Sequence, residues 1–254
     1  MNVITDNPWR KNWRSLGESF GQRWPVPQLI LCISAHWLTE GWWLTAMERP
    51  PTIHDFGGFP QELFDQQYPA PGAPAAAAEI SRYVRQRGSR PLGLDTQQWG
   101  LDHGAWGVIK PVFPQADIPV VQLSMDYSRP PSEHYELARQ LRGLRERGVL
   151  IVGSGNTVHN LRLMQRQAPN DQAFDWALEF DQTVADWIAQ GRLDQLQHFL
   201  DLGSLARMAH PTHEHFLPIL YTAGAVDADE SVRFFNDDYQ AASTAMRSVV
   251  WGGD

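Results

Sequence analysis

Short apolar runs alternate with amphipathic segments from residue 28 to about residue 165, and this alternation constrains the fold more than any other feature. The runs QLILCISA, WWLTAME, RPLGLD, IPVVQLSM and VLIVGSG have the length and continuity of buried strands. Between them, GAPAAAAEISRYVRQRG and SEHYELARQLRGLRERG predict helices that stop at Gly88 and Gly148, the second with Ser132 as its N-cap. The pattern indicates an α/β fold, with a mostly parallel central sheet flanked by helices on both faces.

The two ends of the chain complete the predicted fold. Residues 8–20 predict a first helix, with Asn7 as N-cap and Pro8 at the first helical position. Further along, DQAFDWALEFDQTVADWIAQG predicts a long helix, and HPTHEHFLPILYTAG a loop that leads into a helix. The tail SVRFFNDDYQAASTAMRSVVW predicts a C-terminal β-hairpin. No linker divides the sequence, so residues 1–254 are expected to form one domain.

Composition narrows the classes of partner. The formal net charge is −8, which disfavours nucleic acid or an anionic membrane as the main partner and leaves a small molecule. Cys32 is the one cysteine, so the sequence contains neither a disulfide framework nor a CxxC metal site, and we expect it to be a small core residue. Without a signal-like segment or a long uncharged apolar run, the chain is expected to be cytoplasmic, as a monomer or a homodimer.

Histidines follow several of the predicted strands. Because ligands bind at the carboxyl ends of the strands in such sheets, this position favours a role in a site. The four strand-end histidines are His36, His54, His103 and His159. His213 and His215 lie in a Pro- and Thr-containing loop that opens a helix.

Neutral imidazole is a common metal ligand and a common general base near neutral pH. A site of several histidines and a carboxylate, without thiolate, suits Fe(II), Zn or Mn. No local metal signature is present, since the HEH of residues 213–215 lacks the HExxH spacing. From spacing alone, histidines with purely structural roles remain the alternative.

Some histidines have a simpler interpretation. His134 is expected to be solvated on a helix, and His198 and His210 are expected at the surface. His54 and His103 have two interpretations, as parts of a site or as braces for their loops. His213 is an alternative to His215, because the two are only two residues apart.

Seven phrases, in order along nearly the whole chain, are more specific than any single motif. Together they resemble the class III extradiol aromatic ring-opening dioxygenases, in particular the DOPA 4,5-dioxygenase-like branch. The phrases are SAHW (34–37), PPTIHDFGGFP (50–60), YPAPG (68–72), WGLDHGAWG (99–107), DIPVVQLS (117–124), VLIVGSGNTVHNLR (149–162) and PTHEHFLPILYTAGA (211–225).

The resemblance implies a non-haem metal, with Fe(II) expected for activity and zinc possible as the bound metal. It implies an oxidoreductase that opens the ring of a catechol, such as DOPA, with both atoms of O₂. The implied metal residues are His36, His159 and His215, and the implied catalytic residues are His159 and His103. The implied substrate-binding residues are His54, Asp55, Trp37, Phe56 and Trp106.

One difference from the family pattern concerns the start of the sequence. The family pattern begins with a strand and a GHGSPM phrase whose histidine is a metal ligand, whereas MNVITDN resembles the sequence from that methionine onward. Either Met1 is an internal methionine of a longer chain or the protein lacks that strand and ligand, and we then expect weak metal affinity. The alternative functions are a metal-deficient, non-catalytic protein of the same fold, a zinc-binding protein and a zinc hydrolase.

Overall fold

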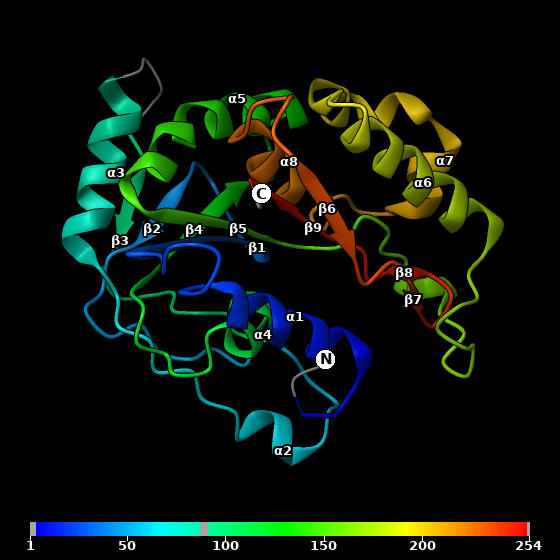
Figure 1. The fold of residues 1–254 in the computed structure, drawn as a ribbon, viewed down its shortest axis with the longest axis horizontal. Coiled ribbons are helices and arrows are strands. Elements are labelled where there is room, and N and C mark those ends of the chain that lie inside the picture. Colours follow the sequence, from blue (N-terminus) through cyan, green and yellow to red (C-terminus); the bar gives the residue numbers. More distant parts are fainter. Residues whose placement is uncertain (1–3, 87–90, 253–254) are drawn as a thin grey trace. The chain divides into compact units, whose positions relative to one another are not determined.

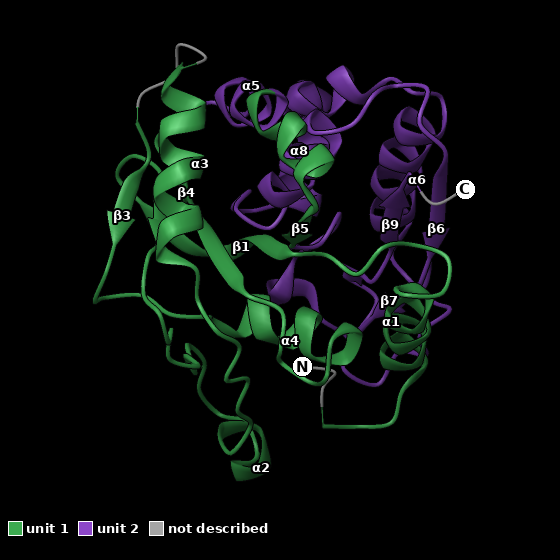
Figure 2. Cartoon of the chain, turned by 60° about the vertical axis from the view of Figure 1, so that its left-hand side comes forward, with its two compact units in different colours: residues 1–128, 140–154 green, residues 129–139, 155–254 purple. Residues whose placement is uncertain are grey.

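The computed structural model describes residues 4–86 and 91–252, and its contacts divide the chain into two compact units. Unit 1 holds residues 1–128 and 140–154, and unit 2 holds residues 129–139 and 155–254 (Figure 2). Each unit is described by itself below. One domain over residues 1–254 stays a prediction.

Unit 1 contains a five-stranded sheet in the order β3-β2-β4-β1-β5 (Figure 1). Its strands are β1 (Leu29–Thr39), β2 (Trp43–Thr45), β3 (Gly93–Asp95), β4 (Val120–Asp126) and β5 (Val149–Ser154). β1 pairs in parallel with both β4 and β5, β2 pairs in parallel with β3, and only the β2–β4 pair is antiparallel. The prediction of a mostly parallel sheet is confirmed.

The register of β1 changes in the second half of the strand. Ile33 pairs with Leu123 of β4 and Leu38 pairs with Met125, so five steps along β1 correspond to two along β4. The extra residues leave the ladder between these pairs, as in a β-bulge, and such irregularities redirect side chains. His36 lies in this stretch. It was predicted to follow the strand, and instead it lies within it, because β1 continues to Thr39.

Three longer helices cover the sheet of unit 1. They are α1 (Pro8–Ser19), α3 (Pro74–Gln86) and α4 (His103–Val112), and a short α2 (Gln61–Phe64) lies in a loop. Figure 1 shows α3 on one side of the sheet, and α4 with α1 on the other. The core between β1 and α4 contains Ile30, Cys32, Trp106 and Ile109, all at most 2% exposed, which confirms the prediction for Cys32.

Local chemistry explains the ends of two of these helices. The Asn7 side chain accepts a hydrogen bond from the amide of Arg10 at 2.9 Å, so the predicted N-cap of α1 is confirmed. The Asp102 side chain accepts a hydrogen bond from the amide of Ala105 at 3.0 Å and caps α4. α4 therefore begins at His103. The predicted stop of α3 at Gly88 lies outside the described residues.

Unit 2 is mainly helical. It holds most of α5 (Pro131–Leu141), α6 (Asp175–Ala189), α7 (Ser204–Ala209) and α8 (Leu217–Gly224), with 3-10 turns at Leu161–Leu163 and Leu193–Leu202. A further 3-10 turn, Arg142–Arg147, belongs to unit 1 and ends at Gly148 with a φ of 75°, which confirms that predicted stop. Pro131 already lies in α5, so Ser132 is inside the helix, and its prediction as the N-cap is wrong.

The C-terminal part of unit 2 forms the predicted hairpin. β6 (Val232–Phe235) pairs antiparallel with β9 (Ser248–Trp251), and the chain between them forms a smaller pair, β7 (Tyr239–Gln240) with β8 (Thr244–Ala245). The AASTAM stretch (241–246) is therefore mostly the turn and second strand of this small pair.

Two histidines of unit 2 were expected to be solvated and are buried. His134 has no exposed surface, and its Nδ1 lies 2.7 Å from the hydroxyl of Tyr221. His210 is 4% exposed, and its Nε2 lies 2.7 Å from the carbonyl oxygen of Thr157. Both predictions are wrong because each histidine has a polar partner from a distant part of the sequence, which offsets the cost of burial.

Among the described residues, no helix has both the length and the apolar character that crossing a membrane requires.

Candidate active site

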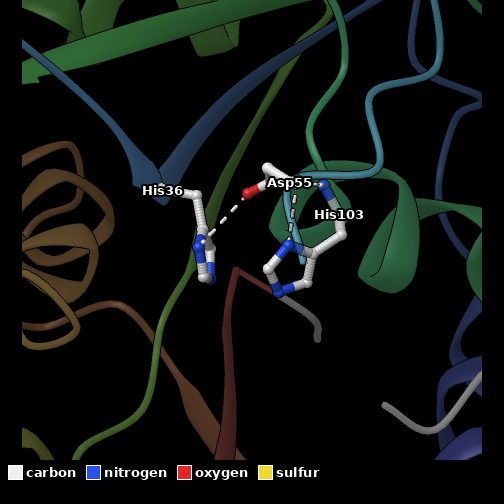
Figure 3. A group of neighbouring side chains, drawn as sticks. All are labelled: His36, Asp55 and His103. Carbon is white, nitrogen blue, oxygen red and sulfur yellow. Dashed lines mark hydrogen bonds and ion pairs between the residues drawn. The ribbon is translucent and has the colours of Figure 1, made fainter. Parts of the chain in front are cut away.

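The first group of candidate residues lies in unit 1 and contains His36, Asp55 and His103; we call it the Asp55 cluster. Each of these residues offers one ligand atom, and the three atoms lie within 4.8 Å of one another. Figure 3 shows the carboxylate of Asp55 at one edge of both imidazole rings, where it faces Nδ1 of each. The ring centroids of His36 and His103 are 3.9 Å apart. The structure thus brings together three of the predicted site residues.

Backbone hydrogen bonds bring the Asp55 loop to the start of α4. The amide of Ile53 donates to the carbonyl oxygen of Leu101 at 2.7 Å, and the amide of Leu101 donates to that of Pro51 at 2.9 Å. The paired residues Ile53 and Leu101 lie two residues before Asp55 and His103, respectively, so the pairing holds these two site residues near each other. The amide of His103 then donates to Oδ1 of Asp55 at 2.8 Å.

A buried carboxylate beneath the cluster connects β1, β4 and α4. Asp102 has no exposed surface, and it accepts hydrogen bonds from Ser34 Oγ at 2.7 Å, Trp99 Nε1 at 3.2 Å and the side-chain amide of Gln122. Ser34 Oγ in turn accepts a hydrogen bond from the amide of His36 at 3.2 Å. This network sets the backbone of His36 relative to the helix that begins at His103.

Gly104 allows the helix to approach β1 closely. A Cβ atom at this position would lie 2.3 Å from Oγ of Ser34 and 2.9 Å from Cδ2 of His36. Both distances are shorter than van der Waals contact, so a larger residue would displace His36.

The charge state of Asp55 follows from its neighbours. Burial raises the pKa of Asp55, but the hydrogen bonds and charge of His103 and the charge of His36 outweigh it, and its pKa lies below the usual value. Asp55 is therefore an ionised acceptor near neutral pH. It was predicted to contact substrate, and in the structure its oxygens face two histidines.

The remaining predicted residues of this region form an aromatic group around the loop of residues 54–64. The ring of Phe56 packs edge-on against His103, with centroids 5.4 Å apart, and also packs on Phe64. His54 Nε2 lies 2.8 Å from the carbonyl oxygen of Gln66, so His54 braces this loop. Phe56 is half-buried, and it is the predicted aromatic residue that both contacts the cluster and keeps exposed surface.

Two predicted substrate contacts are packed inside unit 1. Trp106 has no exposed surface, and its Nε1 donates to the carbonyl oxygen of Ile53 at 2.9 Å. Trp37 is 4% exposed and stacks on Trp99, with centroids 5.9 Å apart and planes 4° apart. A direct substrate contact by either indole stays a prediction. In the structure, both support the loops that carry His103 and Asp55.

The second group lies in unit 2 and contains His159, Glu214 and His215; we call it the His159 cluster. Its three potential ligand atoms also lie within 4.8 Å of one another. The imidazole rings of His159 and His215 stack with centroids 3.5 Å apart and planes 10° apart. The structure thus brings together the two predicted residues of this unit. It places His213, the predicted alternative to His215, outside the group.

Asn156 fixes the orientation of His215. The side-chain amide nitrogen of Asn156 donates to the carbonyl oxygen of Ala245 at 2.8 Å, so its Oδ1 must face His215 Nδ1, 3.2 Å away. An amide oxygen only accepts, and Nδ1 of His215 therefore carries the proton. Nε2 keeps a lone pair, which is the form that binds a metal.

The backbone of His159 is held from two directions. Its amide donates to the carbonyl oxygen of Ala209 at 3.0 Å, and the residue forms an isolated β-bridge with Thr244. The next residue, His210, contacts the carbonyl oxygen of Thr157. Residues 209 and 210 therefore hold the chain at both neighbours of Val158, Thr157 and His159. This arrangement makes His210 a support for the loop that carries His159.

His210 gives a prediction about stability. The rings of Phe180, Phe199 and Phe216 surround it, and burial lowers its pKa to about 3. Below about pH 6.5 the unfolded chain binds a proton that the folded chain does not bind until about pH 3. His210 therefore reduces the free energy of unfolding as the pH falls from about 6.5 toward 3, and has no such effect above that range.

Urea unfolding of the wild type and of His210→Gln at about pH 7.5 and pH 5 measures this contribution. We expect the loss of stability between the two pH values to be smaller in His210→Gln. The exposed His198 provides the matched control, since His198→Gln should leave that loss unchanged. An equal loss of stability in the wild type and in His210→Gln would show that His210 does not contribute to the pH dependence of stability.

Three residues of the two clusters and their supports were missed at the sequence level. Glu214 was visible in the HEH phrase, but its spacing matched no metal motif. Asp102 precedes His103 directly and could have been recognised as a helix N-cap. Asn156 lies in the GSGN turn, and its contact with a residue 59 positions away leaves no local signal.

The donor set of both clusters fits a non-haem metal such as Fe(II) or zinc. Imidazole and carboxylate are the ligands that these metals prefer when thiolate is absent. His215, whose Nδ1–H donates to Oδ1 of Asn156, presents an unprotonated Nε2. The chemistry of the residues therefore agrees with the predicted metal binding, while the identity of the metal is not specified by them.

Comparison with known proteins places this geometry in a family. The model of a family described as the catalytic LigB subunit of aromatic ring-opening dioxygenase matches residues 4–250. The chain belongs to this family. The predicted enzyme class, an extradiol ring-cleavage dioxygenase and thus an oxidoreductase, is confirmed.

Relatives of this LigB family chain share a name. A protein of Escherichia coli (strain K12), 4,5-DOPA dioxygenase extradiol, is 44% identical over 99% of this chain and 91% of its own length. A protein of Beta vulgaris with the same name is 33% identical over 94% of this chain and 87% of its own length. The crystal structure of an uncharacterized protein from Escherichia coli K12 matches with a TM-score of 0.81 and 36% identity, over 98% of this chain and 95% of that one.

Proposed function

We propose that this LigB family member is a non-haem, Fe(II)-dependent enzyme that opens the ring of a catechol such as DOPA with O₂. Relatives named 4,5-DOPA dioxygenase extradiol support the substrate class. The observation that carries the proposal is the grouping of the predicted histidines with carboxylates in two clusters whose donor sets suit such a metal.

In the proposed reaction, a ring carbon–carbon bond next to the two hydroxyls breaks and both oxygen atoms of one O₂ are incorporated. All four electrons that reduce O₂ come from the catechol, so no further reductant is required. When bound, the metal supplies a Lewis acid that lowers the pKa of the catechol hydroxyls and brings the two reactants together.

The proposed metal residues are His36, His159 and His215. This assignment rests on the sequence resemblance, and the structure bears on it through the surroundings of each histidine within its own unit. In unit 1, Nδ1 of His36 faces Asp55; in unit 2, Nδ1 of His215 faces Asn156. Both contacts favour an unprotonated Nε2, so each residue has a lone pair for a metal.

The proposed proton-transfer residues are His159 and His103. A histidine near neutral pKa can take a proton from a substrate hydroxyl and return it when the ring opens. Nδ1 of His103 lies 2.9 Å from Asp55, which leaves Nε2 as the atom that exchanges this proton. Phe56 packs on His103 and keeps exposed surface, which we propose contacts the flat substrate ring.

The experiment is an anaerobic incubation of the protein with excess Fe(II), followed by DOPA and O₂. Excess metal keeps the protein saturated with Fe(II) during the assay. We expect O₂ consumption together with a yellow ring-opened product, and equal amounts of O₂ and DOPA consumed. Binding of zinc without turnover of any catechol in a panel would instead favour a zinc-binding or non-catalytic protein.

The same assay tests the expectation that a further histidine ligand belongs to the site. A form preceded by a strand with the GHGSP phrase should bind Fe(II) more tightly and turn over faster at limiting metal. Equal metal affinity of the two forms would show that this ligand is not needed. The cytoplasmic location and the monomeric or homodimeric state stay predictions from the sequence.

A further inference from the structure

The carboxylate of Asp55 is shared by two histidines with different proposed roles. Oδ1 accepts the backbone amide of His103 at 2.8 Å and lies 2.9 Å from Nδ1 of the same residue. Oδ2 lies 3.4 Å from Nδ1 of His36. Both rings turn the same nitrogen toward Asp55, and their opposite edges point away from it (Figure 3).

We propose that Asp55 is a positioning residue that sets the tautomer of both His36 and His103, rather than a residue that contacts substrate. This inference rests on the proposed function, in which His36 binds the metal and His103 transfers a proton. An ionised carboxylate oxygen next to Nδ1 repels a lone pair there, so the proton of each neutral ring lies on Nδ1. Nε2 of both rings is then available, to the metal in one case and to the substrate in the other.

The arrangement predicts that Asp55→Asn weakens metal binding more than Asp55→Ala, although asparagine has nearly the shape of aspartate. In Asp55→Asn, the amide of His103 keeps the remaining oxygen at its side, because a side-chain NH₂ there would face another donor. The new NH₂ then faces Nδ1 of His36 and donates to it. His36 must carry its proton on Nε2, the atom that should bind the metal. In Asp55→Ala, the carboxylate that favours a proton on Nδ1 of His36 is removed, and no new side-chain donor takes its place.

Nitrogen NMR of the metal-free protein tests the proposal without any activity measurement. Correlation of ring protons with the ring ¹⁵N atoms at about pH 8, where an unperturbed imidazole is neutral, identifies the protonated nitrogen of each histidine. His36→Gln assigns the His36 signals by their absence. We expect protonation of His36 at Nδ1 in the wild type, at Nε2 in Asp55→Asn, and less at Nε2 in Asp55→Ala than in Asp55→Asn.

Metal binding gives the second readout. We expect the affinity for Fe(II) or zinc to fall about 10- to 100-fold in Asp55→Asn, the usual effect of losing a partner of a metal-binding histidine, and to fall less in Asp55→Ala. A residue that only fills space or braces the loop would give the opposite ranking. A residue that itself binds the metal would lose affinity at least as strongly in Asp55→Ala.

Asp95→Asn is the matched control. Asp95 likewise accepts hydrogen bonds from backbone amides in a loop of unit 1, those of Gln97, Gln98 and Trp99. The Asp95→Asn substitution should leave the His36 tautomer and the metal affinity unchanged. The indole N–H signal of Trp106, which is buried in unit 1, reports whether each variant keeps the fold of that unit.

Three results would overturn the proposal: wild-type His36 protonated at Nε2, an unchanged His36 tautomer in Asp55→Asn, or an affinity loss in Asp55→Ala as large as that in Asp55→Asn. Failure of the proposed function looks different. If no catechol is opened by any form, the proposed reaction is wrong, while the tautomers measured in the metal-free protein still decide the role of Asp55.

Discussion

Replacing Asp181 by alanine is expected to lower the free energy of unfolding by about 3–5 kcal/mol, because it leaves a buried charge without its partner. Asp181 lies in α6 and is 1% exposed. It accepts hydrogen bonds from Thr157 at 2.6 Å and Tyr239 at 3.0 Å, and from Arg247 through Nε at 2.9 Å and Nη2 at 2.8 Å. The variant leaves the donor atoms of the buried Thr157 and Tyr239 and of the largely buried Arg247 without this acceptor.

Urea unfolding followed by tryptophan fluorescence measures this loss, with Asp186→Ala as the control. Asp186 is exposed on the same helix, so its substitution should change the free energy of unfolding by less than about 0.5 kcal/mol. Removing both charges in Asp181→Ala with Arg247→Met should recover part of the loss. A loss below about 1 kcal/mol in Asp181→Ala would show that the network is not a main support of unit 2.

Replacing His36 by alanine is expected to have the largest effect on activity. Loss of a ligand should weaken Fe(II) binding by at least about 100-fold, more than loss of a residue that only orients a ligand. The value of kcat/KM at limiting Fe(II) should fall in the same proportion. The measurement combines iron content after desalting with the rate of DOPA turnover.

His198→Ala is the control for this experiment. Its side chain is 55% exposed, and its Nδ1 lies 3.8 Å from Oδ2 of the exposed Asp201. It should retain wild-type iron content and turnover. Full iron content in His36→Ala would refute the ligand role of His36, and a full loss in His198→Ala would point to a general effect of histidine removal.

The sheet could be predicted from the sequence because a buried strand is visible as an unbroken run of apolar residues. Its details depended on tertiary pairing. β1 extends to Thr39 because its neighbour β4 continues alongside the polar end of the run, where the register changes. His36 therefore projects from an irregular stretch inside a strand, a position that no periodicity in one sequence can reveal.

The histidines that the structure groups into the two clusters could be named from the sequence as candidates, whereas their surroundings could not. Asp55 and Asn156 determine which nitrogen of His36 and His215 carries the proton, and both contacts join residues distant in the chain. The buried states of His134 and His210 were missed for the same reason. A histidine that is satisfied by a hydroxyl or carbonyl from far along the chain looks, in sequence, like a surface residue.

The central claim is that this protein opens a catechol ring with both atoms of O₂. Mass spectrometry of the product formed from DOPA under ¹⁸O₂, with the aldehyde trapped by reduction before it exchanges with water, tests this claim most directly. We predict a ring-opened product that contains two labelled oxygen atoms. A quinone without label, or a product with an intact ring, would contradict it.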